Sequence, residues 1–206
     1  MLDLPPSCTT CEDLRPAIRS VRSTYLLAEP VRSVVHALKY GGWFSLARPM
    51  AKRMASVEWP DEVREEVGLV TAVPTSRMKE RQRGYNQAAL LAAETAALLR
   101  RDADCNLLER IRSAGSQTTL HPGERRANVA GAFRLAPGRG HRVAGVHVLL
   151  VDDVWTTGAT ALSCADTLLA AGARAVSVLT FARALPDLER HEQRLEAAAT
   201  FRRRKN

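Results

Sequence analysis

A short apolar run near the end of the chain is followed at once by two acidic residues and a threonine-rich loop. The run, Val148 to Val151, is uninterrupted and partly β-branched, which predicts a parallel strand covered on both faces. Asp152 and Asp153 follow at its carboxyl end, and then Thr156-Thr-Gly-Ala-Thr160 leads into an Ala/Leu-rich segment, 160–171, that predicts a helix. A strand joined by a short loop to a helix favours a layered α/β domain.

The same residues predict the chemistry of a ligand. Unpaired backbone N–H groups at a helix start attract an anion, and the threonine hydroxyls add further donors. Carboxylates accept hydrogen bonds from hydroxyl groups, whereas beside a bare phosphate they would repel it. We therefore expect a ligand with both hydroxyls and a phosphate. The alternative, a core strand and a capped helix with solvated acids, explains neither the paired acids nor three threonines around one glycine.

This strand, acid pair and Thr-Gly-x-Thr loop resemble the signature of the type I phosphoribosyltransferases. The resemblance implies 5-phosphoribosyl-1-diphosphate (PRPP) as substrate, with Mg²⁺ bridging its diphosphate and ribose hydroxyls. It implies that Asp152 and Asp153 are the catalytic pair that holds the ribose hydroxyls. The residues implied to bind the 5-phosphate are Thr156, Thr157, Gly158, Ala159 and Thr160.

The resemblance also implies that this protein lacks an acidic residue next to the acceptor. Purine-salvage members of this group carry an acidic residue at the position of Thr156. With threonine there, transfer would depend on positioning and on electrostatic stabilisation of an oxocarbenium-like transition state.

Four cations within seven residues follow the predicted strand Val67 to Val73, at the edge where a ligand is expected: Arg77, Lys79, Arg81 and Arg83. A diphosphate needs such neutralisation, and arginine suits bidentate contact with phosphate oxygens. A solvated charged face remains the alternative.

Three further blocks resemble the ComF-like phosphoribosyltransferases, which are linked in competent bacteria to DNA uptake. They are Arg83-Gly-Tyr-Asn-Gln87, the stretch 117–133 with Gln117, Arg125 and Asn128, and the stretch 30–41 with Lys39-Tyr40-Gly41. The resemblance spans roughly residues 25 to 183 and adds Arg125 to the expected substrate-binding residues. Plain hydrogen bonding between loops is an alternative for the 117–133 stretch.

The order of elements predicts a doubly wound, mainly parallel sheet of the type I phosphoribosyltransferase kind, preceded by a helical hood segment. The domains expected are an appendage (1–24), a phosphoribosyltransferase-like domain (25–184) and a basic tail (185–206). The elements expected are helices from Pro30 to Gly41, from Leu46, and from Asn86 to Arg101, and strands at 67–73, 107–110, 131–135, 148–151 and 175–181.

The cysteines carry a departure from the family. ComF-like proteins usually have an N-terminal zinc module with two Cys-x-x-Cys pairs, but only Cys8 and Cys11 form such a pair here. Two thiolates supply half of a structural zinc site, so zinc at this pair would need ligands from elsewhere. His36 and Cys105 are distant in sequence and are untested as partners.

Charge and hydropathy limit the classes of partner that this protein can have. A net charge of +8 and a pI near 9.9 favour anionic partners, which include both phosphorylated substrates and nucleic acid. A non-catalytic role in handling single-stranded DNA during uptake is therefore an alternative function, although aromatic residues at 5% provide poorly for base stacking. We expect a cytoplasmic protein with no membrane segment. The family resemblance implies a homodimer.

Overall fold

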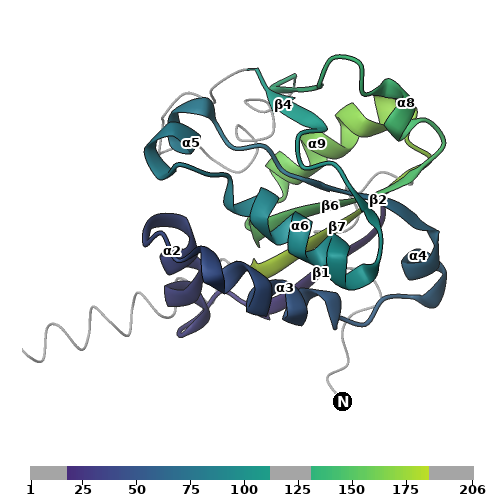
Figure 1. The fold of residues 1–206 in the computed structure, drawn as a ribbon. Helices are drawn as coiled ribbons and strands as arrows, with labels where there is room; N and C mark the ends of the chain where they lie inside the picture. Colours follow the sequence, from purple (N-terminus) through teal and green to yellow (C-terminus); the bar gives the residue numbers. More distant parts are fainter. Residues whose placement is uncertain (1–17, 112–130, 186–206) are drawn as a thin grey trace, which may run out of the picture.

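A parallel sheet forms the centre of the molecule (Figure 1). The structure is a computed structural model that describes residues 18–111 and 131–185. Within these residues, five parallel strands have the order β1-β7-β6-β2-β3, and a separate antiparallel ribbon pairs β4 with β5. The strands are β1 Ile18–Leu26, β2 Val67–Ala72, β3 Asp102–Ala103, β4 Leu108–Arg110, β5 Phe133–Leu135, β6 His147–Trp155 and β7 Ala175–Arg183.

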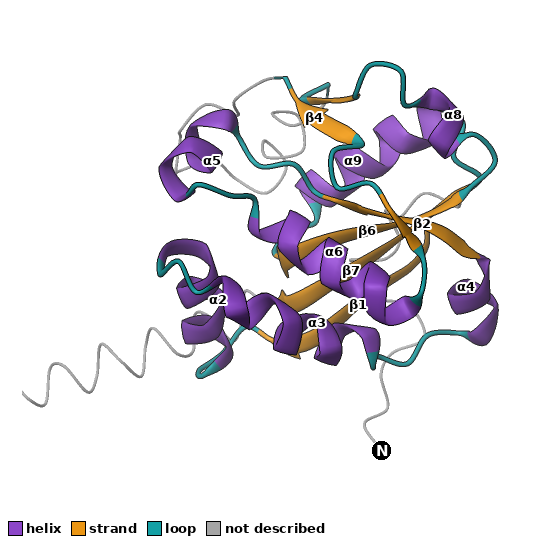
Figure 2. Ribbon diagram, in the orientation of Figure 1, coloured by secondary structure: helices purple, strands orange, loops and turns teal. Residues whose placement is uncertain are grey.

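Helices cover both faces of the sheet (Figure 2). The helices α3 and α6 pack against one face, and α9 packs against the other. This arrangement confirms the doubly wound α/β architecture predicted from the sequence. The helical segments described are α2 Val31–Tyr40, η1 Phe44–Leu46, α3 Ala47–Ala55, α4 Asp61–Glu66, α5 Arg77–Arg83, α6 Gln87–Leu99, α8 Gly140–Val143 and α9 Ala159–Ala170.

The central strands hold the core. Residues 148–151 of β6 are each at most 1% exposed, because β6 lies between β7 and β2 and has helices on both faces. From α6, Leu91 and Ala92 are fully buried against the same core. Burial of each large aliphatic side chain contributes about 1.5–3 kcal/mol. The core thus fixes the end of β6, where the acid pair lies.

The first strand of the sheet differs from the sequence expectation. The sequence predicted no strand before 67–73, and this is wrong, because β1 precedes that strand and pairs with β7 at the sheet edge. β1 crosses the domain boundary expected at residue 24. Its sequence lacks an apolar run because an edge strand is partly solvated, and Arg19 and Arg22 are accommodated there.

Most other predicted elements are present within a residue or two of their expected bounds, but β6 runs four residues past the expected end at Val151, so Asp152 and Asp153 lie within the strand. The helices expected from Pro30, Leu46 and Asn86 are α2, α3 and α6, and the short strands at 107–110 and 131–135 are β4 and β5. The sequence did not identify α4, α5, α8 or the short strand β3. In the part of the chain that the structure describes, no helix combines the length and the apolar character needed to cross a bilayer.

Candidate functional site

A cavity of about 500 Å³ opens at the carboxyl end of the sheet. Ligands of doubly wound sheets bind at this end of the strands. Helices α2 and α5 stand at the same end (Figure 1), and both contribute residues to the wall. Of the residues expected to bind a ligand, the structure brings together five around this cavity: Asp152, Asp153, Thr156, Thr160 and Lys79.

The two carboxylates occupy different surroundings, because successive side chains of a strand point to opposite faces. Asp153 is 3% exposed, and its Oδ2 lies 2.7 Å from Nζ of Lys39 on α2. Asp152 is partly exposed, and its Oδ1 accepts a hydrogen bond of 2.8 Å from the backbone N–H of Asp153. The acid pair therefore has one member neutralised by a lysine and one that faces a neighbouring carboxylate.

This arrangement perturbs the titration of Asp152. Burial, followed by the negative charge of Asp153, raises the pKa of the Asp152 carboxyl well above its usual value, and Lys39 opposes the rise. An ionised Asp152 is thus destabilised in the ligand-free protein. Hydroxyl donors or a cation entering the cavity would stabilise its charge.

The predicted phosphate loop joins β6 to α9 and has the backbone geometry of a helix start. Gly158 has φ of +75° and is the N-cap residue of α9, and Ala159 begins the helix. The Thr157 hydroxyl lies 3.5 Å from the Ala159 nitrogen, and Thr156 and Thr160 line the cavity. The N–H groups of the first turn of this 12-residue helix are suited to an anion.

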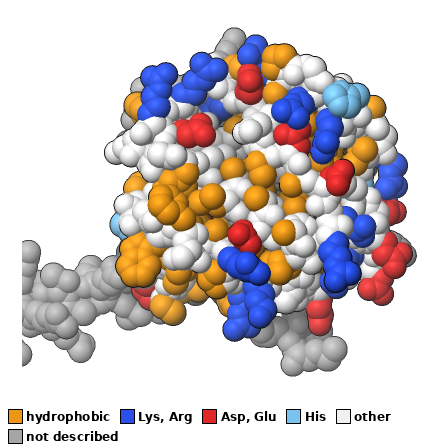
Figure 3. All heavy atoms as spheres, in the orientation of Figure 1, with side chains coloured by type: hydrophobic (Ala, Val, Ile, Leu, Met, Phe, Trp, Pro, Cys, Tyr) orange, Lys and Arg blue, Asp and Glu red, His pale blue; other side chains and the backbone are white. Residues whose placement is uncertain are grey.

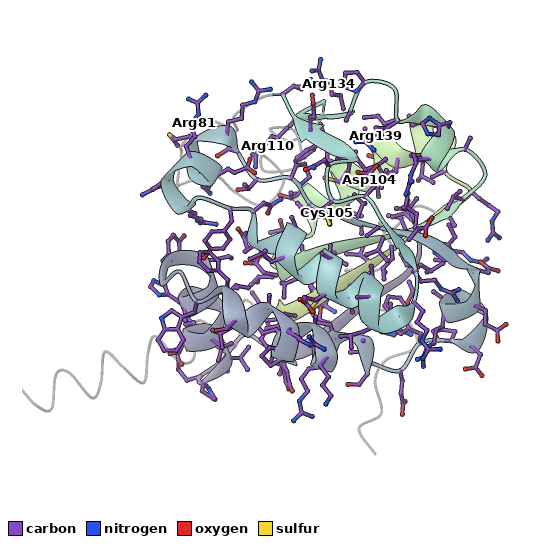
Figure 4. All side chains as sticks on the ribbon, in the orientation of Figure 1. Arg81, Asp104, Cys105, Arg110, Arg134 and Arg139 are labelled. Carbon is purple, nitrogen blue, oxygen red and sulfur yellow. The ribbon has the colours of Figure 1, made fainter. Side chains whose placement is uncertain are left out.

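The four cations of the basic segment do not all reach the cavity. Lys79 lines it, whereas Arg77 lines a neighbouring cavity of about 420 Å³. Arg83 lies over the ring of Tyr40, 4.5 Å from its centroid, and Arg81 points away from the body of the molecule (Figure 4). The remaining expected substrate residue, Arg125, lies outside the described residues, as do Gln117 and Asn128.

Comparison with known proteins places the chain in a family. It is 30% identical over 188 residues to the DNA utilization protein YhgH of Salmonella typhimurium, an alignment that covers 86% of this chain and 78% of that protein. The chain belongs to the ComF-like family.

A second relative supports this assignment, whereas a solved structure carries no weight for it. Competence protein F of Haemophilus influenzae is 29% identical to this ComF-like chain over 159 residues, covering 76% of the chain and 69% of that protein. No family model matches. The crystal structure of TT1426 from Thermus thermophilus covers 72% of the chain and 79% of its own, with 19% identity and a TM-score of 0.40, which is too low to establish a shared fold.

The Arg-Gly-Tyr-Asn-Gln block of this ComF-like protein ties elements together around the cavity. Asn86 donates to the Val73 carbonyl at 3.1 Å, and its Oδ1 accepts from the Ala88 N–H at 3.1 Å, which caps α6. The Tyr85 hydroxyl donates to the Leu38 carbonyl on α2. Arg83 donates to Gln87 at 2.9 Å. This part of the motif therefore supports the walls of the cavity.

Several wall residues were missing from the sequence-based set of site residues. Arg32, His36 and Lys39 recur at helical spacing and present one face of α2 to the cavity. Arg110 on β4 lines both cavities, and burial lowers the pKa of its guanidinium. The helical spacing of the three α2 residues could have indicated from the sequence that they share one face. The position of Arg110 could not, because it depends on the pairing of β4 with β5.

The family resemblance implies two ions, zinc near the cysteine pair and Mg²⁺ with the substrate. Cys8 and Cys11 lie outside the described residues. Across residues 18–111 and 131–185, no three His, Cys, Asp or Glu side chains form a metal-binding group. Cys105 donates from Sγ to the Ala89 carbonyl at 3.4 Å, and His36 packs on Tyr40 with ring centroids 4.8 Å apart. Carboxylate oxygens of the acid pair are the donor type that Mg²⁺ prefers, usually together with substrate phosphates and water.

Proposed function

We propose that this ComF-like protein binds PRPP and transfers its phosphoribosyl group to a nitrogen acceptor, with release of diphosphate. The observation that carries the proposal is the shared cavity, in which the acid pair, the threonine loop and Lys79 surround one space at the carboxyl end of the sheet. Each group matches one part of PRPP. A cavity of this size also has room for a ligand of that class.

The proposed contacts follow from charge and donor type. The N–H groups at the start of α9 and the hydroxyls of Thr156 and Thr160 bind the 5-phosphate. The carboxylates accept hydrogen bonds from the ribose hydroxyls, and Lys79 neutralises the diphosphate. Mg²⁺ with PRPP would be held chiefly by oxygens of the ligand, assisted by Asp152 and Asp153 through hydroxyl groups or water, and would supply further charge neutralisation.

Transfer breaks the bond from C1 of the ribose to the diphosphate and forms a bond from the acceptor nitrogen to C1. Positive charge develops on the ribose ring as the leaving group departs, and the carboxylates nearby stabilise it. Cations at the other end stabilise the departing diphosphate. Thr156 does not exchange a proton near neutral pH, so positioning and electrostatics account for the expected rate enhancement.

Calorimetric titration with PRPP and Mg²⁺ tests the proposal. The wild type should bind, and the Asp152→Asn/Asp153→Asn protein should bind at least about tenfold more weakly, since each carboxylate loses charge-assisted hydrogen bonds. Asp102→Asn, at an exposed residue of β3, is the matched control. A wild-type protein that shows no binding would sink the assignment.

A role in handling single-stranded DNA is the second candidate function, and two findings favour it. The relatives are named for DNA utilization and competence. Three exposed aromatic residues lie beside the basic helix α5: Tyr40 is 59%, Trp43 60% and Phe44 53% exposed. Arg83 covers the Tyr40 ring, and the Phe44 ring lies 4.6 Å from that of Tyr85, just beyond α5.

This aromatic surface, Tyr40, Trp43 and Phe44, offers exposed rings for base stacking even though aromatic residues make up only 5% of the sequence. Aromatic residues are few, but the fold places Tyr40 under Arg83 and Phe44 against Tyr85, both from a segment about 40 residues later. Hydrophobic side chains gather over α2, with basic side chains over α5 above them (Figure 3). Stacking on exposed rings contributes about 1–3 kcal/mol per base.

Fluorescence titration with a thymidine oligonucleotide tests this second function. Binding, followed through the anisotropy of a dye on the oligonucleotide so that every variant gives the same readout, should weaken on Trp43→Ala and fall steeply with salt. Trp59→Phe, at a partly buried residue, serves as the control. Removal of the cations at 202–205 should also weaken binding. Binding that is insensitive to salt would count against this function.

A further inference from the structure

Lys39 crosses from one wall of the cavity to the other. It lies in the last turn of α2, and its Nζ is 2.7 Å from Oδ2 of Asp153 at the end of β6. The Lys39 side chain is 23% exposed and that of Asp153 is 5% exposed, so water screens this ion pair only weakly. Lys39 was not among the site residues expected from the sequence.

The backbone on either side of this contact is fixed. Leu38 is fully buried, and its carbonyl accepts a hydrogen bond from the Tyr85 hydroxyl. Asp153 belongs to the part of β6 that pairs with β7. The ammonium group therefore approaches the carboxylate from a supported position, and its removal would change what Asp153 contacts.

We propose that Lys39 is a positioning residue of the ligand site. It holds the Asp153 carboxylate in one orientation and ties α2 to the end of β6, which sets the distance between the two walls. The inference rests on the proposed PRPP site, and it assigns to Lys39 an action through Asp153 and not a contact with the ligand. Two adjacent carboxylates repel, so a fixed cation on one of them makes the pair tolerable in the ligand-free protein.

A double-mutant cycle on binding separates this role from direct contact. The four proteins are the wild type, Lys39→Met, Asp153→Asn and the double variant, each titrated with PRPP and Mg²⁺. Lys39→Met should weaken binding about tenfold, within the range of coupling between contacting residues. In the Asp153→Asn background the same change should cost almost nothing further. Losses that multiply would show that Lys39 contacts the ligand and would overturn the inference.

Two further variants complete the test: a conservative replacement of Lys39 and the removal of a lysine far from the cavity. Lys39→Arg keeps a cation within reach of Asp153 and should retain affinity within about threefold. Lys52→Met, at an exposed residue of α3, removes the same charge elsewhere and should leave affinity unchanged. Equal losses in Lys39→Arg and Lys39→Met would contradict a positioning role that needs only the charge.

Measurements on the ligand-free protein distinguish failure of this inference from failure of the PRPP assignment. If the wild type does not bind PRPP, the proposed function fails, but the tie between α2 and β6 can still be measured. Lys39→Met should then increase amide hydrogen exchange in α2 severalfold while exchange in α6 stays unchanged. Unchanged exchange in α2, together with additive effects of the Lys39 and Asp153 variants on unfolding, would overturn the inference.

Discussion

Gly158 lies against the indole ring of Trp155, so closely that a Cβ atom on the glycine would be 2.2 Å from Cζ2 of the ring. Trp155 is 4% exposed at the end of β6, and the chain passes over it to begin α9. Gly158 also has φ of +75°, a conformation that side chains rarely adopt. The glycine of the threonine loop is therefore required by packing and by backbone conformation.

Replacement of Gly158 should move the loop and destabilise the protein. Gly158→Ala is expected to lower the free energy of unfolding by about 2–4 kcal/mol, because a left-handed alanine and a steric clash both contribute. Gly138→Ala is a matched control, since Gly138 has φ of +76° but no heavy atom within 4 Å of its added Cβ. Urea denaturation compares the two variants. Equal losses would show that the Trp155 contact is unimportant.

Neutralising Asp152 should stabilise the ligand-free protein near neutral pH. Burial and the charge of Asp153 raise the pKa of Asp152, so the folded state holds its proton more tightly than the unfolded state. Stability therefore falls as the pH rises from the unfolded pKa through the folded one. Asp152→Asn removes this loss, with a gain on the order of 1 kcal/mol at pH 7.

Denaturant titrations at pH 3.5 and pH 7 check this sign. The gain from Asp152→Asn should be present at pH 7 and should be mostly lost at the lower pH, where the wild-type carboxyl is protonated in the folded state and largely protonated in the unfolded state. Asp102→Asn should show no such gain because Asp102 is exposed. A destabilised Asp152→Asn protein at pH 7 would mean that the ionised carboxylate already has a favourable partner.

The sequence predicted the buried strand and the helix start at the candidate site because their determinants are local, although β6 continues through both acids to Trp155. An apolar β-branched run specifies the buried strand β6, and Gly158 with the following Ala/Leu segment specifies the start of α9. By contrast, β1 was missed because its edge position permits Arg19 and Arg22 among its residues. Hydrophobic patterning identifies buried strands more readily than edge strands.

The features of the candidate site that the sequence did not predict depend on long-range contacts. Charge alone could not show that Arg83 stacks on Tyr40 while Lys79 faces the cavity, because the neighbour that each cation meets depends on how α2 and the sheet lie beside α5. The pairing of Lys39 with Asp153 joins residues 114 positions apart and depends on how α2 packs beside the sheet. Such pairs follow from tertiary structure, which a single sequence does not specify at this level.

Asn86 should matter for stability more than for phosphate binding. It caps α6 through Oδ1 and bonds the Val73 carbonyl through Nδ2, so Asn86→Ala should cost about 1–2 kcal/mol of unfolding free energy. Arg81→Ala, a few residues earlier on the solvent side of α5, should leave stability unchanged. Thermal and urea unfolding provide the comparison. A stable Asn86→Ala protein would favour a role for this residue in binding alone.

His147 should make the protein less stable in mild acid. It is 1% exposed, and its Nε2 lies 2.9 Å from the Ser177 hydroxyl at the end of the sheet opposite the acid pair. Burial lowers the pKa of His147, and Glu66, whose Oε2 lies 3.3 Å from Nδ1, opposes that shift. The unfolded state therefore takes up a proton first, and stability falls as the pH decreases below the ordinary histidine value.

Urea titrations between pH 7.5 and 5.5 measure this dependence. The wild type should lose up to about 1.4 kcal/mol per pH unit from this group, and His147→Gln should lose less over the same range. Glu66→Gln should have the opposite effect on the pH dependence. It removes the carboxylate that raises the His147 pKa, so the loss of stability should extend to lower pH. An unchanged slope in His147→Gln would assign the pH dependence to another group.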